Sequence, residues 1–92
     1  MRNTEIACRL EEVARLLKEQ EANPYRVQAY RHAAETLRRL DQPVIEILQQ
    51  AGAEGLRCLP GIGESLARSI REWVLTGRLP ILARLRNRTD GE

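Results

Sequence analysis

The 92-residue sequence is poor in the residues from which most metal sites and covalent cross-links are built. It contains two cysteines, Cys8 and Cys58, and a single histidine, His32. The cysteines form no CxxC pair, and with the histidine they make no recognisable set of metal ligands. We therefore expect neither a zinc site nor a disulfide, but two free thiols that are buried or half-buried, as unpaired cysteines usually are.

Long hydrophobic runs are also lacking. No apolar stretch approaches the roughly 18–20 residues of a membrane-spanning helix. The N-terminal stretch "MRNTEIACRLEEV" carries charges throughout, unlike a signal peptide. These absences predict a protein without a membrane partner, located in the cytoplasm and associated with the nucleoid if the source is bacterial. They leave open whether the 92 residues are a whole protein or a fragment.

Lysine is almost absent. Of the 15 basic residues, 14 are arginines and the other is Lys18, while the formal net charge is only +2. Residues 65–88 contain six arginines against the single acidic residue Glu72. Guanidinium groups pair well with phosphate, so this charge favours a nucleic-acid partner. A solvated surface enriched in arginine by codon usage is an equally open interpretation.

Helical spacing dominates the chain, and no stretch alternates like a β-strand. The first helix has an apolar face with steps of four, three and four residues, and Asn3 or Thr4 can cap it. This face consists of Ile6, Leu10, Val13 and Leu17. The sequence predicts an all-α fold, a compact bundle of five or six short helices in one domain over residues 1–92. We expect residues 1–3 and 87–92 to be frayed.

The starts of the next two helices carry a capping residue followed by proline. Asn23 and Pro24 begin the second helix, and Asp41 and Pro43 precede a short third one. Gly52 can end the third helix, after which "AEGLRCL" adds one more helical turn.

Two further helices are expected near the C-terminus. One covers Glu64 to Thr76 and stops at Gly77 in a left-handed conformation. A last short helix covers Leu79 to Leu85 and packs its leucines onto the body of the domain.

Between the third and fourth helices, the stretch "CLPGIGESLARSI" stops one helix and starts the next within a few residues. Pro60 cannot continue a helix, and Gly61 and Gly63 leave the backbone uncovered. The first N–H groups of the following helix have no intrahelical partner, and the helix dipole adds positive charge there. Such a turn favours a phosphate, with Ile62 anchoring the loop in the core. A helical turn without a ligand is the other interpretation.

Other glycine-rich motifs do not fit this turn. A dinucleotide fingerprint needs a third glycine, where this chain has Leu66, and a preceding strand. A Walker-type loop needs Gly-Lys-Ser/Thr, where this chain has Gly63-Glu64-Ser65. Nucleotide hydrolysis is therefore not expected.

"LPGIGESLARSI" resembles the helix-hairpin-helix motif, which binds the DNA backbone without sequence specificity. Together with "NPYRVQAYRHAAETL" and "TGRL", it is similar in order and spacing to the N-terminal helical domain of family X DNA polymerases, the family of DNA polymerase beta. The resemblance covers roughly residues 3–86.

The resemblance implies two kinds of site in the hairpin, which spans Leu59 to Gly63. Backbone N–H groups from Gly61 to Ser65, with Ile62 and Glu64 between them, would hold a DNA phosphate. The carbonyl groups of Arg57, Leu59 and Ile62 would coordinate a monovalent cation, sodium or potassium, that bridges to this phosphate. No other cofactor is implied.

Arginines would support this contact. Arg68 is the leading candidate, because it lies one turn along the helix that follows the hairpin, while Arg71, Arg78 and Arg84 are weaker ones. Arg26 and Tyr30 match positions that line a pocket for a 5′-phosphate at a gap or nick, although Tyr30 also lies on the apolar stripe of its helix.

The chain differs from this family at the position of the catalytic lysine. Family members remove a 5′-deoxyribose phosphate through a lysine Schiff base, and the matching position here is Ser69, with Ser65 and Ile81 at two other basic positions. Serine cannot form an imine, and Lys18 lies on the first helix amid glutamates. The polymerase body is also absent, so we expect no enzymatic activity.

The sequence therefore predicts a monomeric, non-catalytic, sequence-nonspecific DNA-binding domain of DNA repair or replication, with a preference for gapped or nicked DNA. Two alternatives stay open. One is a protein-interaction module whose partner is unknown, and the other is a 5′-deoxyribose-phosphate lyase with an atypical nucleophile such as the N-terminal amine.

Overall fold

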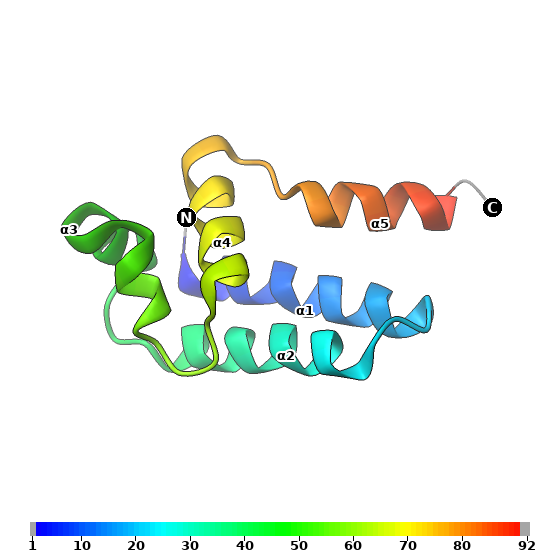
Figure 1. The fold of residues 1–92 in the computed structure, drawn as a ribbon. Helices are drawn as coiled ribbons and strands as arrows, with labels where there is room; N and C mark the ends of the chain where they lie inside the picture. Colours follow the sequence, from blue (N-terminus) through cyan, green and yellow to red (C-terminus); the bar gives the residue numbers. More distant parts are fainter. Residues whose placement is uncertain (1, 91–92) are drawn as a thin grey trace.

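The computed structural model describes residues 2–90, in which five α-helices and no strands are found. The helices are α1 (Asn3–Glu19), α2 (Pro24–Arg39), α3 (Val44–Arg57), α4 (Glu64–Thr76) and α5 (Pro80–Asp90). The domain measures 42 × 24 × 20 Å. The predicted all-α bundle is confirmed (Figure 1).

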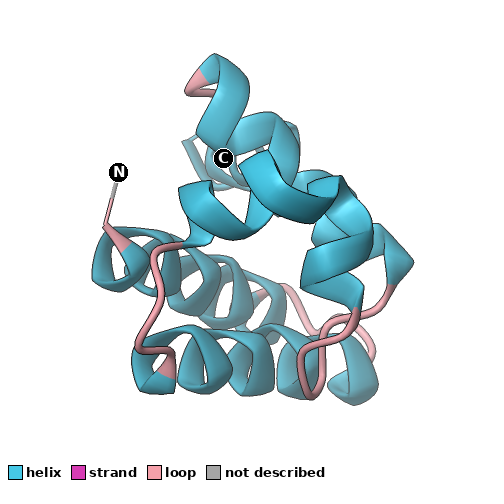
Figure 2. Ribbon diagram, turned by 90° about the vertical axis from the view of Figure 1, so that its left-hand side faces the viewer, coloured by secondary structure: helices cyan, strands magenta, loops and turns pink. Residues whose placement is uncertain are grey.

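Helices α1 and α2 run antiparallel side by side and form the base of the domain (Figures 1 and 2). The alanines of α2 allow this close approach, because Ala33 and Ala34 are fully buried between the helices. The predicted apolar face of α1 is buried along its whole length. Its four members are Ile6, Leu10, Val13 and Leu17. Burial of this stripe, rather than local propensity, holds the pair together.

The first helix does not use the predicted cap. Arg2 is the N-cap of α1, and Asn3 already lies inside the helix. The side chain of Asn3 instead reaches the start of α3, where its Oδ1 accepts a hydrogen bond from the Val44 N–H at 2.9 Å and its Nδ2 donates one to the Gln42 carbonyl at 2.9 Å. The prediction that Asp41 caps α3 is therefore wrong, because a side chain from α1 satisfies the first N–H group of that helix.

Two glycine predictions and one asparagine prediction are confirmed. Asn23 caps α2 by accepting the Tyr25 N–H at 2.8 Å, with Pro24 at the first position. Gly77 ends α4 with φ 75°. Gly52, with φ 64°, interrupts α3 and separates its first two turns from the short segment that leads into the hairpin. The domain has five helices if α3 is counted as one and six if its two parts are counted separately, as the predicted range of five or six allows.

Helix α5 packs against α1 and is longer than the predicted segment from Leu79 to Leu85. The three predicted leucines are buried, at 5–7% exposure. They are Leu79, Leu82 and Leu85. The backbone continues as a helix to Asp90. Of the segments expected to be frayed, residues 1–3 and 87–92, Met1, Gly91 and Glu92 lie outside the described residues.

The burial predicted for the two cysteines is wrong, because Cys8 and Cys58 are both free and exposed. Cys8 lies outside the buried arc that Ile6, Ala7 and Leu10 form on α1, and Cys58 follows the last residue of α3. Among the described residues, no helix is long and apolar enough to cross a membrane.

Candidate nucleic-acid interface

The hairpin between α3 and α4 is a tight turn built from residues 58–63. Two backbone hydrogen bonds close it, from the Leu59 N–H to the Leu56 carbonyl at 3.0 Å and from the Ile62 N–H to the Leu59 carbonyl at 3.2 Å. Ile62 is 4% exposed and belongs to the hydrophobic core, whereas Gly61 and Gly63 are exposed. The predicted arrangement, with an apolar anchor between two uncovered glycines, is present.

Gly61 is required by the fold itself. Its φ of +78° is rarely adopted by residues with a side chain, and a β-carbon added here would lie 2.6 Å from Nδ1 of His32. One turn further along α2, the hydroxyl of Thr36 donates a hydrogen bond to the Pro60 carbonyl at 2.8 Å. The face of α2 that carries His32 and Thr36 therefore fixes the position of the hairpin.

The sequence did not predict that His32 and Thr36 contact the hairpin. Both are polar, and their contacts are with a loop 24 to 29 residues further along the chain. A helical spacing of four residues places them on one face of α2, but the spacing alone does not say what that face meets.

Gly63, in contrast, is not required by the fold. Its φ of −90° and ψ of −174° are open to any residue, and a β-carbon added here would meet nothing within 4 Å. Neither backbone strain nor packing within the described residues explains a glycine at this position. What the missing side chain provides is access to the backbone at the start of α4.

Three backbone donors lie at this point. The N–H groups of Gly63, Glu64 and Ser65 have no hydrogen-bond partner within residues 2–90, and all three residues are exposed. Gly63 is the N-cap of a 13-residue helix, so the positive end of the helix dipole lies at the same place. Unpaired N–H groups and a helix dipole together make a site that suits an oxyanion such as phosphate.

The charged side chains near this site are paired. Arg68, the leading supporting arginine, forms an ion pair with Glu64 at 3.0 Å, and both side chains are well exposed. Arg57, at the end of α3, pairs with Glu54 at 2.8 Å. The hydrogen bond and the charge of Glu54 raise the pKa of the Arg57 guanidinium. A phosphate at the hairpin would therefore compete with Glu64 for Arg68.

The three carbonyl groups of the implied cation site all belong to the hairpin and its entry. Within residues 2–90, the carbonyl oxygens of Arg57 and Ile62 accept no hydrogen bond, and that of Leu59 accepts only the Ile62 N–H. Because a carbonyl oxygen has two lone pairs, each of the three retains a free acceptor position. Carbonyl oxygens are ligands that a hard cation prefers, so the chemistry of this donor set suits one.

Arg26 and Tyr30 are separated from the hairpin site. Tyr30 is 7% exposed and belongs to the hydrophobic core, as its place on the apolar stripe of α2 predicts. Arg26 is exposed and lines a pocket of about 380 Å³ together with Ile81 and Arg84 of α5. The structure thus brings Arg26 together with one of the positions matched by resemblance, Ile81, and adds Arg84.

The residues considered for covalent chemistry lie on two helices. Ser69 is half-buried on α4, Ser65 is exposed at the start of the same helix, and Lys18 is exposed near the end of α1. In the part of the chain that the structure describes, no group of three or more histidine, cysteine, aspartate or glutamate side chains could hold a metal ion.

The fold and the hairpin define a class of protein, an all-helical domain in which a glycine-containing turn leads into an exposed helix N-terminus. Residues 1–79 match the helix-hairpin-helix domain family, and the chain belongs to this family. Helix-hairpin-helix domains commonly bind DNA without sequence specificity. No curated protein sequence matches the chain. The match contains α1 to α4 and the hairpin, whereas α5 lies beyond it.

Proposed function

We propose that this domain binds the phosphate backbone of DNA without sequence specificity, through the backbone N–H groups of Gly63, Glu64 and Ser65. The observation that carries the proposal is Gly63, a glycine for which neither its conformation nor its packing gives a reason. Close approach of a ligand to the backbone is such a reason. Main-chain donors contact phosphate and not base edges, so binding of this kind carries no sequence information.

In this proposal, arginine side chains make additional contacts with the DNA phosphates. Arg68 exchanges Glu64 for a phosphate, which it binds in a bidentate manner. Arg71 lies one turn further along the exposed side of α4 and forms no ion pair within residues 2–90. With so few phosphates neutralised, a single domain binds in the roughly micromolar to sub-millimolar range near physiological salt.

A sodium or potassium ion would be held by the carbonyl oxygens of Arg57, Leu59 and Ile62. Bound there, it supplies a positive charge beside the phosphate. The free acceptor positions on these carbonyls support this part of the proposal.

Gapped or nicked DNA is the proposed preferred form, with a role in repair or replication. In support, Arg26 and Arg84 line a common pocket, and neither forms an ion pair with any described residue. Two unpaired guanidinium groups in one pocket suit the dianion of a terminal phosphate, which an intact duplex lacks. The domain acts as a monomer in this proposal.

The proposed function is non-catalytic. Ser69 stands where a Schiff-base lysine would be needed, and Lys18 lies on a different helix, away from the hairpin. Borohydride reduction in the presence of DNA with an abasic 5′-phosphate tests this point. We expect no trapped adduct, and an adduct that maps within the domain would show a lyase with an atypical nucleophile.

The variant Gly63→Ala tests the phosphate site. Its β-carbon enters open space, so the free energy of unfolding should change by less than about 1 kcal/mol, the usual cost of alanine at an N-cap. The same carbon lies where the phosphate approaches, and affinity for a labelled duplex at low salt should fall about tenfold, the loss of one charge-assisted hydrogen bond. Unchanged affinity of this variant would show that the hairpin is not the phosphate site. Absence of binding by the unmodified domain would favour a protein partner.

A further inference from the structure

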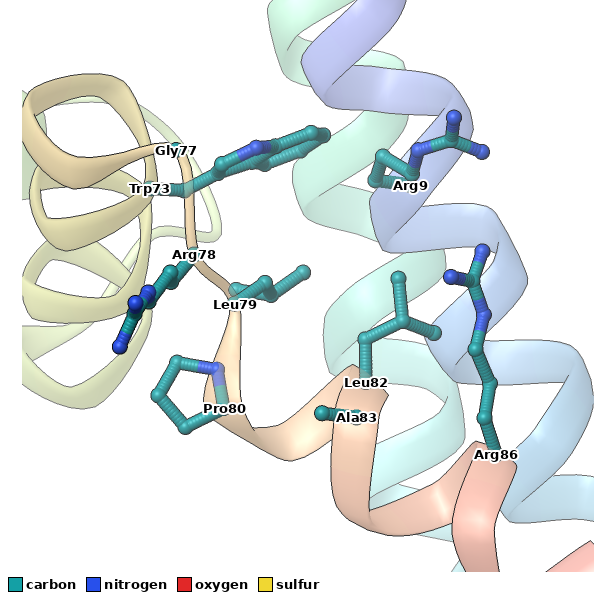
Figure 3. Close-up of a pocket in the computed structure, with 9 residues that line it drawn as sticks. All are labelled: Arg9, Trp73, Gly77, Arg78, Leu79, Pro80, Leu82, Ala83 and Arg86. Carbon is teal, nitrogen blue, oxygen red and sulfur yellow. The ribbon is translucent and has the colours of Figure 1, made fainter.

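A second site lies at the opposite end of α4 from the hairpin. There the turn from α4 to α5 packs over α1 and leaves a pocket of about 470 Å³ (Figure 3). We refer to it as the Trp73 pocket, after the only tryptophan of the chain, which contributes to its wall. The proposed DNA-binding function does not use this pocket.

The walls of the Trp73 pocket are apolar. Trp73 of α4, Leu79 of the connecting turn and Leu82 of α5 point toward α1, and Ala83 lies beside Leu82 (Figure 3). Within residues 2–90 the indole N–H of Trp73 has no hydrogen-bond partner. Every side-chain nitrogen there that is fully buried does have a partner, so the indole nitrogen is not fully buried. The indole N–H is therefore open to solvent and available as a donor.

The charged residues that line the pocket are all arginines. Arg78 lies on one side, and Arg9 and Arg86 lie on the other (Figure 3). Glu12 of α1 pairs with Arg9 at 3.2 Å and with Arg86 at 2.7 Å, so one carboxylate is shared between two guanidinium groups. Three positive charges thus face one negative charge, and each paired guanidinium keeps N–H groups that Glu12 does not use.

Nucleic acid does not suit this pocket. Its tryptophan is only 8% exposed, so no ring face is available for stacking on a base. The hairpin and the pocket are separated by the length of α4, about 20 Å for 13 residues. Moreover, α5, which supplies Leu82, Ala83 and Arg86, lies beyond the family match.

We infer that the Trp73 pocket is a docking site for an acidic peptide segment of a partner protein. An apolar side chain of the peptide enters between Leu79, Leu82 and Ala83, and flanking carboxylates bind Arg78 and the free N–H groups of Arg9 and Arg86. The domain then holds DNA at one end of α4 and a protein at the other. This inference does not depend on the proposed DNA contact.

A fluorescein-labelled peptide in which a leucine pair is flanked by glutamates serves as the probe. Its binding is followed by anisotropy and by the emission of Trp73, the single tryptophan. Two control peptides carry lysines in place of the glutamates or serines in place of the leucines. We expect the acidic peptide with leucines to bind and to shift the Trp73 emission, and both controls to bind at least about fivefold more weakly.

Matched variants locate the binding. Arg78→Glu reverses an exposed charge of the pocket, and Arg71→Glu reverses an exposed charge on α4 outside it. Arg78→Glu should weaken peptide binding about fivefold or more, because it removes about what one exposed ion pair contributes. Arg71→Glu should weaken peptide binding less than twofold. Ala83→Phe, which places a ring where the apolar side chain of the peptide would enter, should abolish the emission change. Circular dichroism confirms that the variants are folded.

The outcomes are distinct from those of the DNA experiment. Gly63→Ala should bind the acidic peptide as the unmodified domain does. Equal binding of the lysine peptide, equal effects of the two arginine variants, or displacement of the peptide by duplex DNA would overturn the inference. Displacement by DNA would assign the pocket to nucleic acid, and it would leave the hairpin proposal to be decided by Gly63→Ala.

Discussion

Replacing Glu64 by proline removes one of the three proposed phosphate donors without disturbing the helix that carries it. Glu64 is the first residue of α4, where proline is favoured and where its N–H has no partner within residues 2–90. Proline also restricts the residue before it to extended conformations, and Gly63 is already extended at φ −90° and ψ −174°. The substitution removes the ion pair with Arg68 as well, so it needs a control.

Glu64→Ala is that control. It removes the same carboxylate and keeps the backbone N–H, so the two variants have equal charge and differ in one donor. A hydrogen bond to a charged group contributes about 1.5–3 kcal/mol, which corresponds to roughly ten- to hundredfold in Kd. The alanine variant should bind DNA as well as the unmodified domain or better, because Arg68 is released and a negative charge is removed.

Fluorescence anisotropy with a labelled duplex at low salt measures both Kd values, and urea denaturation shows that the variants are equally folded. We expect their free energies of unfolding to agree within about 1 kcal/mol, since proline acts mainly on the unfolded chain. Equal affinities of the proline and alanine variants would refute the reasoning, because the N–H of Glu64 would then contact no phosphate.

Gly61→Ala should lower the free energy of unfolding by about 1–3 kcal/mol, because alanine is strained at φ +78° and its β-carbon would meet His32; an unchanged urea midpoint would contradict this. Partial burial raises the pKa of Glu12, but hydrogen bonds and charges from Arg86 and Arg9 outweigh it and leave the pKa below its ordinary value of 4.5. The stabilisation by this ion pair, about 1 kcal/mol at most, is therefore present above pH 4.5 and lost as the pH falls through the lowered pKa of the folded state. Glu12→Gln should accordingly be less stable than the unmodified domain at neutral pH and equally stable in strong acid, and a difference that persists in acid would exclude the ion pair as its cause. The logarithm of DNA affinity should fall with the logarithm of salt concentration with a slope of about −1 to −3, as expected for a few phosphates, and a slope near zero would exclude a backbone contact.

The parts of the fold that depend on local rules could be predicted from the sequence. Asn23 before a proline and Gly77 after an apolar stripe mark helix ends by the bonds and backbone angles that these residues favour. Gly52 likewise marks the break in α3. The hairpin could also be predicted from local rules, since proline and two glycines leave few alternatives to a tight turn.

Contacts between distant segments could not be predicted in this way. Asn3 appears from the sequence to be a cap for its own helix, yet it bonds to the start of α3, about 40 residues away. Arg86 pairs with Glu12 across 74 residues, a contact that no spacing rule addresses. The prediction that the cysteines are buried failed for a related reason. Free cysteines are buried on average, but this tendency does not say on which side of α1 Cys8 lies.

The candidate site shows the same division. The hairpin residues could be predicted because proline and glycine set the backbone of their own turn. The packing of His32 against Gly61 could not, because it depends on how α2 docks against the hairpin. The distinction between the two glycines is also a result of the tertiary structure. From the sequence Gly61 and Gly63 are equivalent, and only the packing shows that one is needed by the fold and the other leaves the backbone open.

The most direct test of the phosphate site is a titration of the ¹⁵N-labelled domain with short duplexes of unrelated sequence, followed through the amide resonances. We expect the largest shifts at Gly63, Glu64 and Ser65, and we expect them to be the same for each duplex and to disappear at high salt. Shifts that differ between sequences, or that centre on α2 or α5 and leave these three amides unchanged, would contradict this expectation.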